Sequence, residues 1–167
     1  MAVARDEVDG DESGRRFLPY LRAVVLESLR LWPTTPMILR QTTAPVQWAQ
    51  GRMPAKCGVL IYSPYFHRDE RHVQGAHDFS PGRWLSGEQD DWPLVPFSDG
   101  PVVCPGKQLV LLLTSAALAS LVHGHDFGVE DGQALDPARP LPGTLDNFSV
   151  RLRVVSRTSA HDTAPPA

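Results

Sequence analysis

The sequence predicts an α+β fold that is mainly helical, with two main helices, small β-hairpins and a long irregular meander. Two segments carry apolar residues at helical spacing, and short runs rich in β-branched residues lie between prolines and glycines. A third observation is the stretch 64–103, which has little periodicity, five prolines and four glycines. The chain of 167 residues has the length of about one domain.

The first helix is predicted over 17–31, after a polar lead-in. Residues 1–16 are polar and rich in acidic side chains, so they predict either a loose lead-in or a solvated acidic loop. From there Leu21, Val25 and Leu29 recur at steps of four, as they do on one face of a helix. Pro33 ends the run, because proline lacks the N–H that would continue a helix.

Short strands and the meander follow this helix. Strands are predicted at 38–43, 46–49 and 59–63, where β-branched residues occur in short runs between turn residues. Residues 64–103 are expected to be irregular, apart from one helical turn near 69–73. An irregular stretch of this length is uncommon inside a domain and is usually functional.

The second main helix is predicted over 105–123, with Pro105 at its start. Nearly every position in it is apolar, so we expect it to be buried on most sides. Strands are predicted at 126–130 and 148–155, and a disordered tail at 156–167. The strongest helical face in this segment comprises Leu109, Leu112, Leu113, Ala116, Ala117 and Ser120.

Composition and charge exclude several functions. The net charge of −3 provides no basic surface for a nucleic acid or an anionic membrane. Two cysteines are too few for a disulfide scaffold. The apolar stretch 109–122 is shorter than the ~20 residues of a membrane span, and 1–16 lack the apolar core of a signal peptide. We therefore expect no membrane span and a cytoplasmic location.

Cys104 is the most reactive candidate because it directly precedes a predicted helix. Unpaired N–H groups and the helix dipole at such a position favour the thiolate. Gly100 and Gly106 flank it and would allow the backbone to approach a bulky object. A thiolate held this way could be a nucleophile or a soft metal ligand, and a buried structural cysteine is the simpler alternative. None of the six histidines falls in a known cysteine-protease pattern.

Glu27 and Arg30 are three residues apart in the first helix and can pair on one face. Their neighbours are so apolar that at least partial burial is expected. A buried ion pair requires further donors, and Arg83 in the segment FSPGRW is the best third partner. The alternative is an ordinary ion pair on the helix surface.

Four motifs, in order, resemble the C-terminal haem-binding part of a cytochrome P450. The segment LESLR (26–30) is similar to the ExxR motif, and FHRDERHV (66–73) to the segment after the central sheet. FSPGRW (79–84) resembles the meander motif, and FSDGPVVCPG (97–106) the haem loop FxxGxRxCxG. The resemblance extends over about 17–155 and identifies this span as a partial P450 domain.

This resemblance implies a cofactor and the residues that hold it. Cys104 would be the axial thiolate ligand of the iron of haem b, and such a thiolate favours O–O cleavage. Phe97 would pack near the sulfur, and Gly100 and Gly106 would let the loop pass the porphyrin. Arg40 matches a position that often pairs with a haem propionate.

The resemblance also implies a reaction and partners. The family inserts one oxygen atom from O2 into a small organic substrate, with electrons from a ferredoxin or a reductase. Glu27, Arg30 and Arg83 would form the family's structural triad. Two positions depart from the pattern: Val102 replaces the loop arginine, and Lys56 with Cys57 replaces a glycine–threonine turn.

The sequence leaves a second class of function open. The family's long distal helix, which supports oxygen activation, has no counterpart in 1–16. The chain could therefore be a non-catalytic truncated P450 remnant, or one half of a split assembly with a missing N-terminal half, and bind haem weakly or not at all. In either case we expect exposed apolar helix faces. An unrelated enzyme with a cysteine nucleophile is a third hypothesis.

Overall fold

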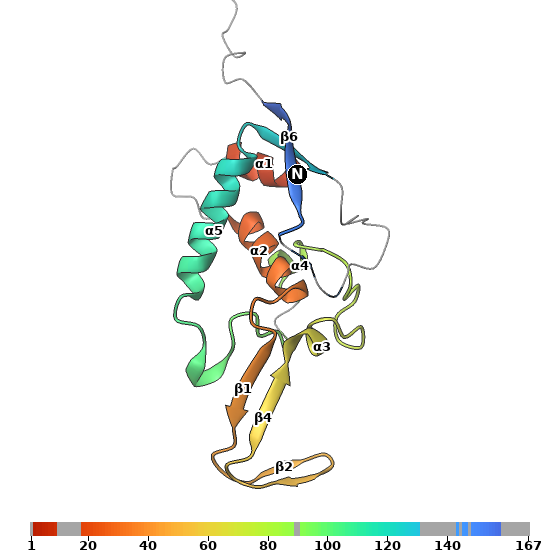
Figure 1. Cartoon of the computed structure of the whole chain (residues 1–167), viewed down its shortest axis with the longest axis vertical. Helices are drawn as coiled ribbons and strands as arrows, with labels where there is room; N and C mark the ends of the chain where they lie inside the picture. Colours follow the sequence, from red (N-terminus) through yellow and green to blue (C-terminus); the bar gives the residue numbers. More distant parts are fainter. Residues whose placement is uncertain are drawn as a thin grey trace, which may run out of the picture.

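The computed structural model describes residues 2–9, 18–88, 91–130, 143, 145–146 and 148–157. Its main helices lie together, and a pair of strands extends away from them to a small hairpin (Figure 1). The α+β prediction is confirmed. The helices are α1 (Ala2–Asp9), α2 (Pro19–Leu31), α3 (Ser63–His67), α4 (Arg83–Ser86) and α5 (Lys107–Val122), with a 3-10 turn at Gly100–Val102.

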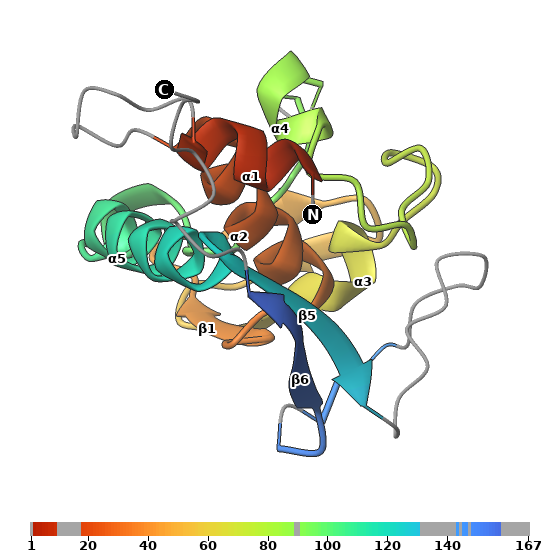
Figure 2. The same cartoon turned by 90° about the horizontal axis from the view of Figure 1, so that it is seen from above.

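Helix α2 lies between α1, α5, α3 and α4 and organises the structure (Figure 2). It begins at Pro19, where a missing N–H costs nothing. Its buried face combines apolar Leu21, Val25 and Leu31 with the charged pair Glu27 and Arg30. The prediction of a helix over 17–31 is confirmed for 19–31, and residue 17 lies outside the described residues.

The loose lead-in predicted for 1–16 is wrong for 2–9, which form α1. Two apolar residues four positions apart, Ala4 and Val8, are buried against Leu18, Leu21 and the end of α5. Two buried apolar residues give only a weak periodic signal in a segment rich in acidic residues, so the sequence does not predict this helix.

An acidic residue of α1 also caps α2. The carboxylate of Glu7 accepts hydrogen bonds from the backbone N–H groups of Tyr20 at 2.6 Å and Leu21 at 3.0 Å. These are two of the four donors that the start of a helix leaves unpaired. A negative charge there also opposes the positive end of the helix dipole. Glu7 therefore replaces a local N-cap, which Leu18 cannot provide.

Helix α5 is present as predicted but its expected burial is wrong. Among the described residues it packs against α1, α2 and β5, through Leu111, Ser115, Ala119 and Val122. Of the face predicted to be buried, the three leucines are 51–59% exposed. Because the helix is apolar all round, periodicity could not show which side meets α2.

The strands form three antiparallel pairs. Strand β1 (Met37–Gln41) pairs with β4 (Gly58–Tyr62), β2 (Val46–Trp48) with β3 (Gly51–Met53), and β5 (His125–Glu130) with β6 (Arg151–Arg157). The predicted strands are therefore confirmed with shifted ends, and β3 is additional. The tail predicted over 156–167 is wrong at its start, because Ser156 and Arg157 pair with the beginning of β5 past an irregularity in register. Residues 158–167 lie outside the described residues.

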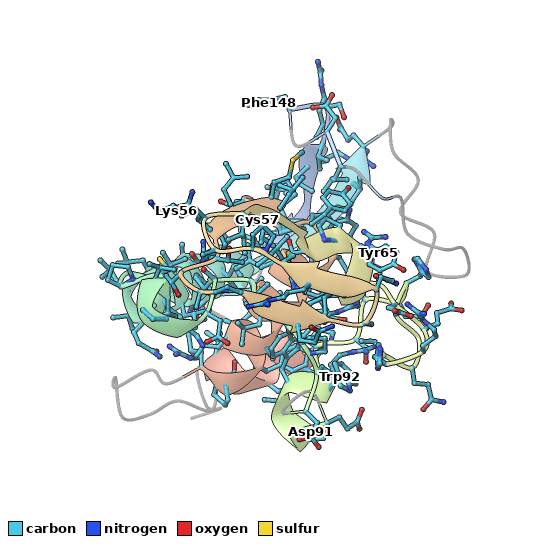
Figure 3. The ribbon with its side chains drawn as sticks, turned by 90° about the horizontal axis from the view of Figure 1, so that it is seen from below. Lys56, Cys57, Tyr65, Asp91, Trp92 and Phe148 are labelled. Carbon is cyan, nitrogen blue, oxygen red and sulfur yellow. The ribbon has the colours of Figure 1, made fainter. Side chains whose placement is uncertain are left out.

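The turn before β4 contains the unusual pair Lys56 and Cys57 (Figure 3). Lys56 has φ +61°, in the left-handed region that favours glycine. Cys57 continues the strand ladder: its N–H donates to Thr42 Oγ1 at 2.9 Å, and its carbonyl accepts from the Thr42 N–H at 3.0 Å. Cys57 thus has a structural place in this turn.

The meander 64–103 is mostly irregular, as predicted. The expected turn near 69–73 is present, since the Val73 N–H donates to the Asp69 carbonyl at 2.9 Å. Val73 and Ala76 are fully buried and fix the segment against the helices. In the described part of the chain, no helix is both long and apolar enough to span a bilayer.

Candidate functional site

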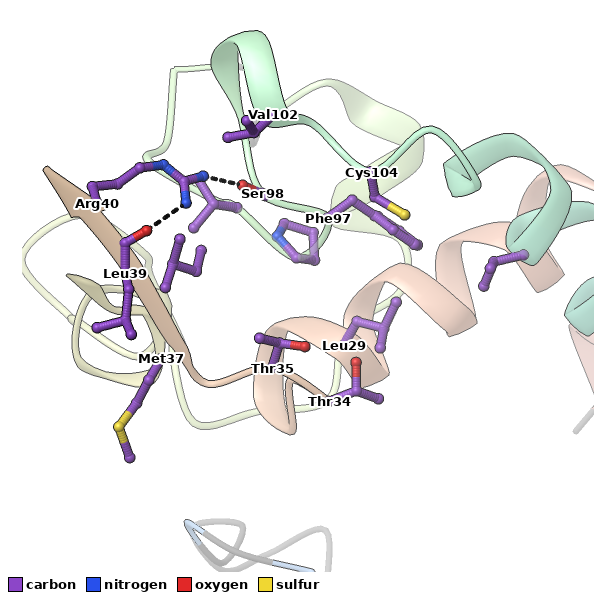
Figure 4. A pocket seen from close by; sticks show the side chains of 14 residues that line it. Leu29, Thr34, Thr35, Met37, Leu39, Arg40, Phe97, Ser98, Val102 and Cys104 are labelled. Carbon is purple, nitrogen blue, oxygen red and sulfur yellow. Dashed lines mark hydrogen bonds between the residues drawn. The ribbon is translucent and has the colours of Figure 1, made fainter. Parts of the chain in front are cut away.

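An open cavity of about 620 Å³ lies between β1 and the loop that carries Cys104 (Figure 4). This volume is typical of small-molecule sites, which span roughly 300–1,000 Å³. Its wall is mainly apolar, with Arg40 the one charged side chain among the described residues that line it. The lining comprises Leu29, Thr34, Thr35, Met37, Ile38, Leu39, Arg40, Val95, Pro96, Phe97, Ser98, Val102, Cys104 and Val110.

The Cys104 loop is closed by backbone hydrogen bonds. The Cys104 N–H donates to the Phe97 carbonyl at 2.8 Å, and the Val103 N–H donates to the Gly100 carbonyl at 3.1 Å. Gly100 has φ +68°, a conformation that glycine adopts readily. The loop therefore holds Cys104 and Phe97 in the same wall of the cavity (Figure 4).

Helix α5 begins at Lys107 rather than at Pro105, so Cys104 lies in the turn before it. The Lys107 N–H donates to the Cys104 carbonyl at 3.2 Å. A Cβ on Gly106 would lie 3.8 Å from Cys104 Sγ. Glycine therefore keeps the space beside the sulfur free of a side chain.

Arg40 reaches the cavity from β1. Its Nη2 donates to Ser98 Oγ at 2.6 Å and its Nη1 to the carbonyl of Leu39 at 2.9 Å (Figure 4). Both acceptors are neutral oxygens, so neither of them balances the positive charge of the guanidinium beside the apolar wall. Val102, also in the wall, offers no donor there.

Glu27 and Arg30 form a fully buried bidentate pair on α2. The guanidinium donates from Nε to Oε2 at 2.8 Å and from Nη2 to Oε1 at 2.9 Å. Burial alone raises the pKa of Glu27, yet the bonds and charge of Arg30 lower it below its ordinary value. The Ser80 N–H at 2.9 Å and the Trp84 indole N–H at 2.8 Å stabilise the same carboxylate.

Every N–H of Arg30 has an acceptor. Besides the two bonds to Glu27, Nη1 donates to the backbone carbonyls of His67 at 2.8 Å and Ala76 at 2.7 Å. Nη2 donates to the backbone carbonyl of Asp78 at 2.9 Å. A guanidinium has five N–H groups, so this buried charge is fully satisfied. Its partners in the meander make α2 the anchor of that segment.

Arg83 completes the cluster from α4. Its Nε lies 3.3 Å from Glu27 Oε1, and its side chain is 6% exposed. The Gln74 and Gly75 carbonyls accept from its Nη groups at 3.2 and 3.1 Å. Its guanidinium also lies over the ring of Trp92, 5.4 Å from the centroid, near α4 (Figure 3). The structure thus brings Glu27, Arg30 and Arg83 together.

His67 is a buried residue that joins this cluster to the cavity wall. Its Nδ1 lies 3.2 Å from the Arg30 carbonyl, and its Nε2 accepts from the Val95 N–H at 3.0 Å. An accepting Nε2 requires the neutral ring with a proton on Nδ1. Burial and the nearby charge of Arg30 lower the pKa of His67 to about 4.

Sequence reasoning missed His67, Trp84 and Ser98. All three lie within quoted motifs, FHRDERHV, FSPGRW and FSDGPVVCPG, but their partners are far away in the chain. Trp84 is 57 residues from Glu27, and Ser98 is 58 residues from Arg40. The only available signal was that a tryptophan or histidine in a motif needs a polar partner when it is buried.

Comparisons with known proteins define the family. The family model for cytochrome P450 matches residues 3–146. Ferruginol synthase and sugiol synthase of Salvia miltiorrhiza are 35% and 36% identical, over 92% and 93% of this chain and 32% of each relative. A crystal structure of a cytochrome P450 matches with a TM-score of 0.76 and 27% identity, over 94% of this chain and 38% of that one.

The chain belongs to the cytochrome P450 family, whose cofactor is haem. It spans about a third of the length of the curated relatives it matches. The lining of the cavity is compatible with this group: the wall is mainly apolar like a porphyrin face, the Cys104 sulfur is a soft donor, and the Arg40 cation suits a carboxylate. Within the described residues no cluster of three or more His, Cys, Asp or Glu could hold a metal ion.

Proposed function

We propose that this chain is the haem-binding segment of a P450 monooxygenase and that Cys104 would be the thiolate ligand of the iron. The observation that carries the proposal is the shared cavity of Cys104, Phe97 and Arg40. When bound, the haem would supply the activation of O2, and a thiolate ligand favours O–O cleavage. The proposed reaction inserts one oxygen atom into a small organic substrate, with electrons from a ferredoxin or a reductase.

The chain's own residues would hold and orient the cofactor. Phe97 would cover the sulfur side of the loop, and Gly100 and Gly106 would allow the backbone to pass close to the porphyrin. Arg40 would donate to a propionate carboxylate through a charge-assisted bond. Each of these roles is consistent with the position of the residue in the cavity or the loop.

The buried triad would act on the site indirectly. Glu27, Arg30 and Arg83 hold the meander against α2, and His67 connects the Arg30 carbonyl to the backbone of Val95. Val95 lines the cavity just before Phe97. We propose that the triad positions this wall and takes no part in chemistry.

A haem titration tests the proposal with a matched control. The chain with Cys104→Ser should bind haem more weakly and lose the thiolate signature of the ferric spectrum. The variant Cys57→Ser changes the other cysteine, which lies in the strand turn, and should behave as the wild type. Equal spectra for the wild type and Cys104→Ser would exclude Cys104 as the ligand.

A second candidate is that the chain is one half of a split assembly, or a non-catalytic remnant, and binds haem weakly or not at all. The exposed apolar side of α5 favours it, since Leu109, Leu112, Leu113 and Leu121 are each more than half exposed. Turnover assays on the 167-residue chain with haem, NADPH and a reductase separate the two. Substrate oxidation that is lost in Cys104→Ala would favour the first candidate.

A further inference from the structure

The Arg40–Ser98 contact carries an inference that rests on the proposed function and deepens it. We propose that Ser98 is a positioning residue that aims Arg40 at an acidic edge of the ligand. The cavity would then prefer a porphyrin with free carboxylates over the same porphyrin with esterified ones. Nothing in the comparisons assigns a role to Ser98.

The first argument is the charge of the cavity. Arg40 is the one charged side chain among the described residues that line it. Its two acceptors, Ser98 Oγ and the Leu39 carbonyl, are neutral oxygens. Three of its five N–H groups have no acceptor among the described residues. A guanidinium in this state is a ready partner for an anion, and carboxylates match its planar geometry.

The second argument is the backbone of Ser98. Its φ is +62°, in the left-handed region where residues other than glycine are uncommon. Such conformations persist where the surroundings determine them and cluster at functional sites. Here the Ser98 N–H donates to the Val95 carbonyl at 3.0 Å, and the hydroxyl accepts from Arg40 at 2.6 Å. Glycine would relieve this strain, but it would remove the hydroxyl that holds Arg40.

The third argument is that the loop offers no second cation at the cavity. Val102 lines the wall between Ser98 and Cys104 and is 56% exposed. Lys107, the next basic residue, lies over the Phe97 ring, 6.0 Å from its centroid, and is not part of the lining. Recognition of a carboxylate at this cavity would therefore depend on Arg40 and on the residue that orients it.

Iron-free protoporphyrin IX and its dimethyl ester test the inference without the thiolate. Binding is followed by porphyrin fluorescence. The wild type should bind the free acid roughly tenfold or more tightly than the ester, as expected for a charge-assisted hydrogen bond. Arg40→Gln should remove this preference. Ser98→Gly, which suits a positive φ, should reduce it by about three- to tenfold while affinity for the ester stays unchanged.

Three further variants complete the test. Thr35→Val changes another polar residue of the same cavity and should keep the full preference for the free acid. Val102→Arg, added to Ser98→Gly, should restore the preference by placing a second cation in the wall. Ser98→Ala should match Ser98→Gly, which separates loss of the hydroxyl from a change in backbone freedom.

The outcomes distinguish this inference from the proposed function. A wild type that binds acid and ester equally, or binds neither, overturns the inference. A full preference for the acid in Ser98→Gly also overturns it. Iron-free porphyrin needs no iron ligand, so the preference for the acid over the ester does not depend on thiolate ligation. A wild type that lacks the thiolate signature in the haem titration would therefore refute the proposed function alone.

Discussion

At the scale of residues, the Glu27–Arg30–Arg83 cluster decides how the meander meets α2. The Glu27 carboxylate accepts hydrogen bonds from the Arg30 guanidinium, a backbone N–H and an indole N–H, and it forms an ion pair with Arg83. Removing the carboxylate therefore leaves buried charge unpaired. Glu27→Gln should lower the free energy of unfolding by about 3–5 kcal/mol. Trp84→Phe, which deletes one donor, should cost about 1–2 kcal/mol.

Urea denaturation of the two variants measures these costs. The control is Arg71→Gln, which removes the exposed partner of an ion pair with Asp69 and should change the midpoint far less, because the Arg71 side chain is 70% exposed. Equal midpoints for Glu27→Gln and this control would contradict the buried triad.

His67 gives the fold a defined dependence on pH. Its pKa of about 4 in the folded state lies below the ordinary 6.5, so between these values the unfolded chain binds more protons. Stability from this group is therefore complete above pH 6.5 and is lost as pH falls to about 4. The full loss is about 3 kcal/mol. His67→Gln should flatten the stability curve in this window, and an unchanged slope would show that His67 is not buried and neutral.

At this scale the sequence predicts the charged residues of the buried cluster and misses the neutral groups that bond to charged partners. The i, i+3 spacing of Glu27 and Arg30 predicts their contact, and the need of a buried ion pair for further donors predicts Arg83. The bonds of Trp84 and Ser98 could not be predicted, because a neutral side chain carries no charge that calls for a distant partner. Their partners depend on how the meander folds back on α2.

At the scale of elements, α5 shows the limit of periodicity. Its segment is so uniformly apolar that helical spacing alone cannot identify the packed side. The face with the strongest spacing is in fact the exposed one. The side that packs on α2 is narrow, with Leu111, Ser115 and Ala119. The hydroxyl of Ser115 bonds the Leu111 carbonyl within the helix, so even a polar residue fits this side.

Substitution of two leucines that are two positions apart tests which side of α5 is packed. Leu111 is 2% exposed and Leu113 is 59% exposed. Leu111→Ala should cost about 2–4 kcal/mol through lost burial and a cavity, and Leu113→Ala less than ~1 kcal/mol. Thermal unfolding of the two variants measures the difference. The reverse order would place the packed side of α5 on the face that the sequence predicted.

Helix α1 shows a different limit. Three of its eight residues are acidic, and the two that are shown to be buried are Ala4 and Val8, so the sequence carries only a weak helical signal. The cap from Glu7 to the start of α2 explains how such a short helix is held. An acidic side chain that bonds N–H groups of another helix has no local signature, so the role of Glu7 could not be predicted.

At the scale of the whole molecule, apolar side chains line the outer side of α5 and the mouth of the cavity. Such surfaces mark an interaction site or a tendency to aggregate. We expect the purified chain to self-associate as its concentration rises. Leu112→Lys with Leu113→Glu should reduce this in sedimentation experiments without lowering the unfolding midpoint. A wild type that stays monomeric at high concentration would contradict the expectation.

The general architecture is the part that the sequence predicts best. Two helices, small strand pairs and an irregular meander all follow from periodicity and from prolines and glycines. The cavity itself could not be predicted from composition, because it forms where β1 meets a loop more than fifty residues further on. The resemblance of four motifs supplied its chemistry, and the structure shows which residues share one wall.

Thiolate ligation of haem by Cys104 is the central claim, and the spectrum of the reduced CO complex tests it most directly. The haem-loaded chain is reduced, CO is added, and the absorption spectrum is recorded for the wild type, Cys104→Ala and Cys57→Ser. The account predicts the red-shifted Soret band of a thiolate complex in the wild type and in Cys57→Ser, and its loss in Cys104→Ala. A red-shifted band that survives in Cys104→Ala would contradict it.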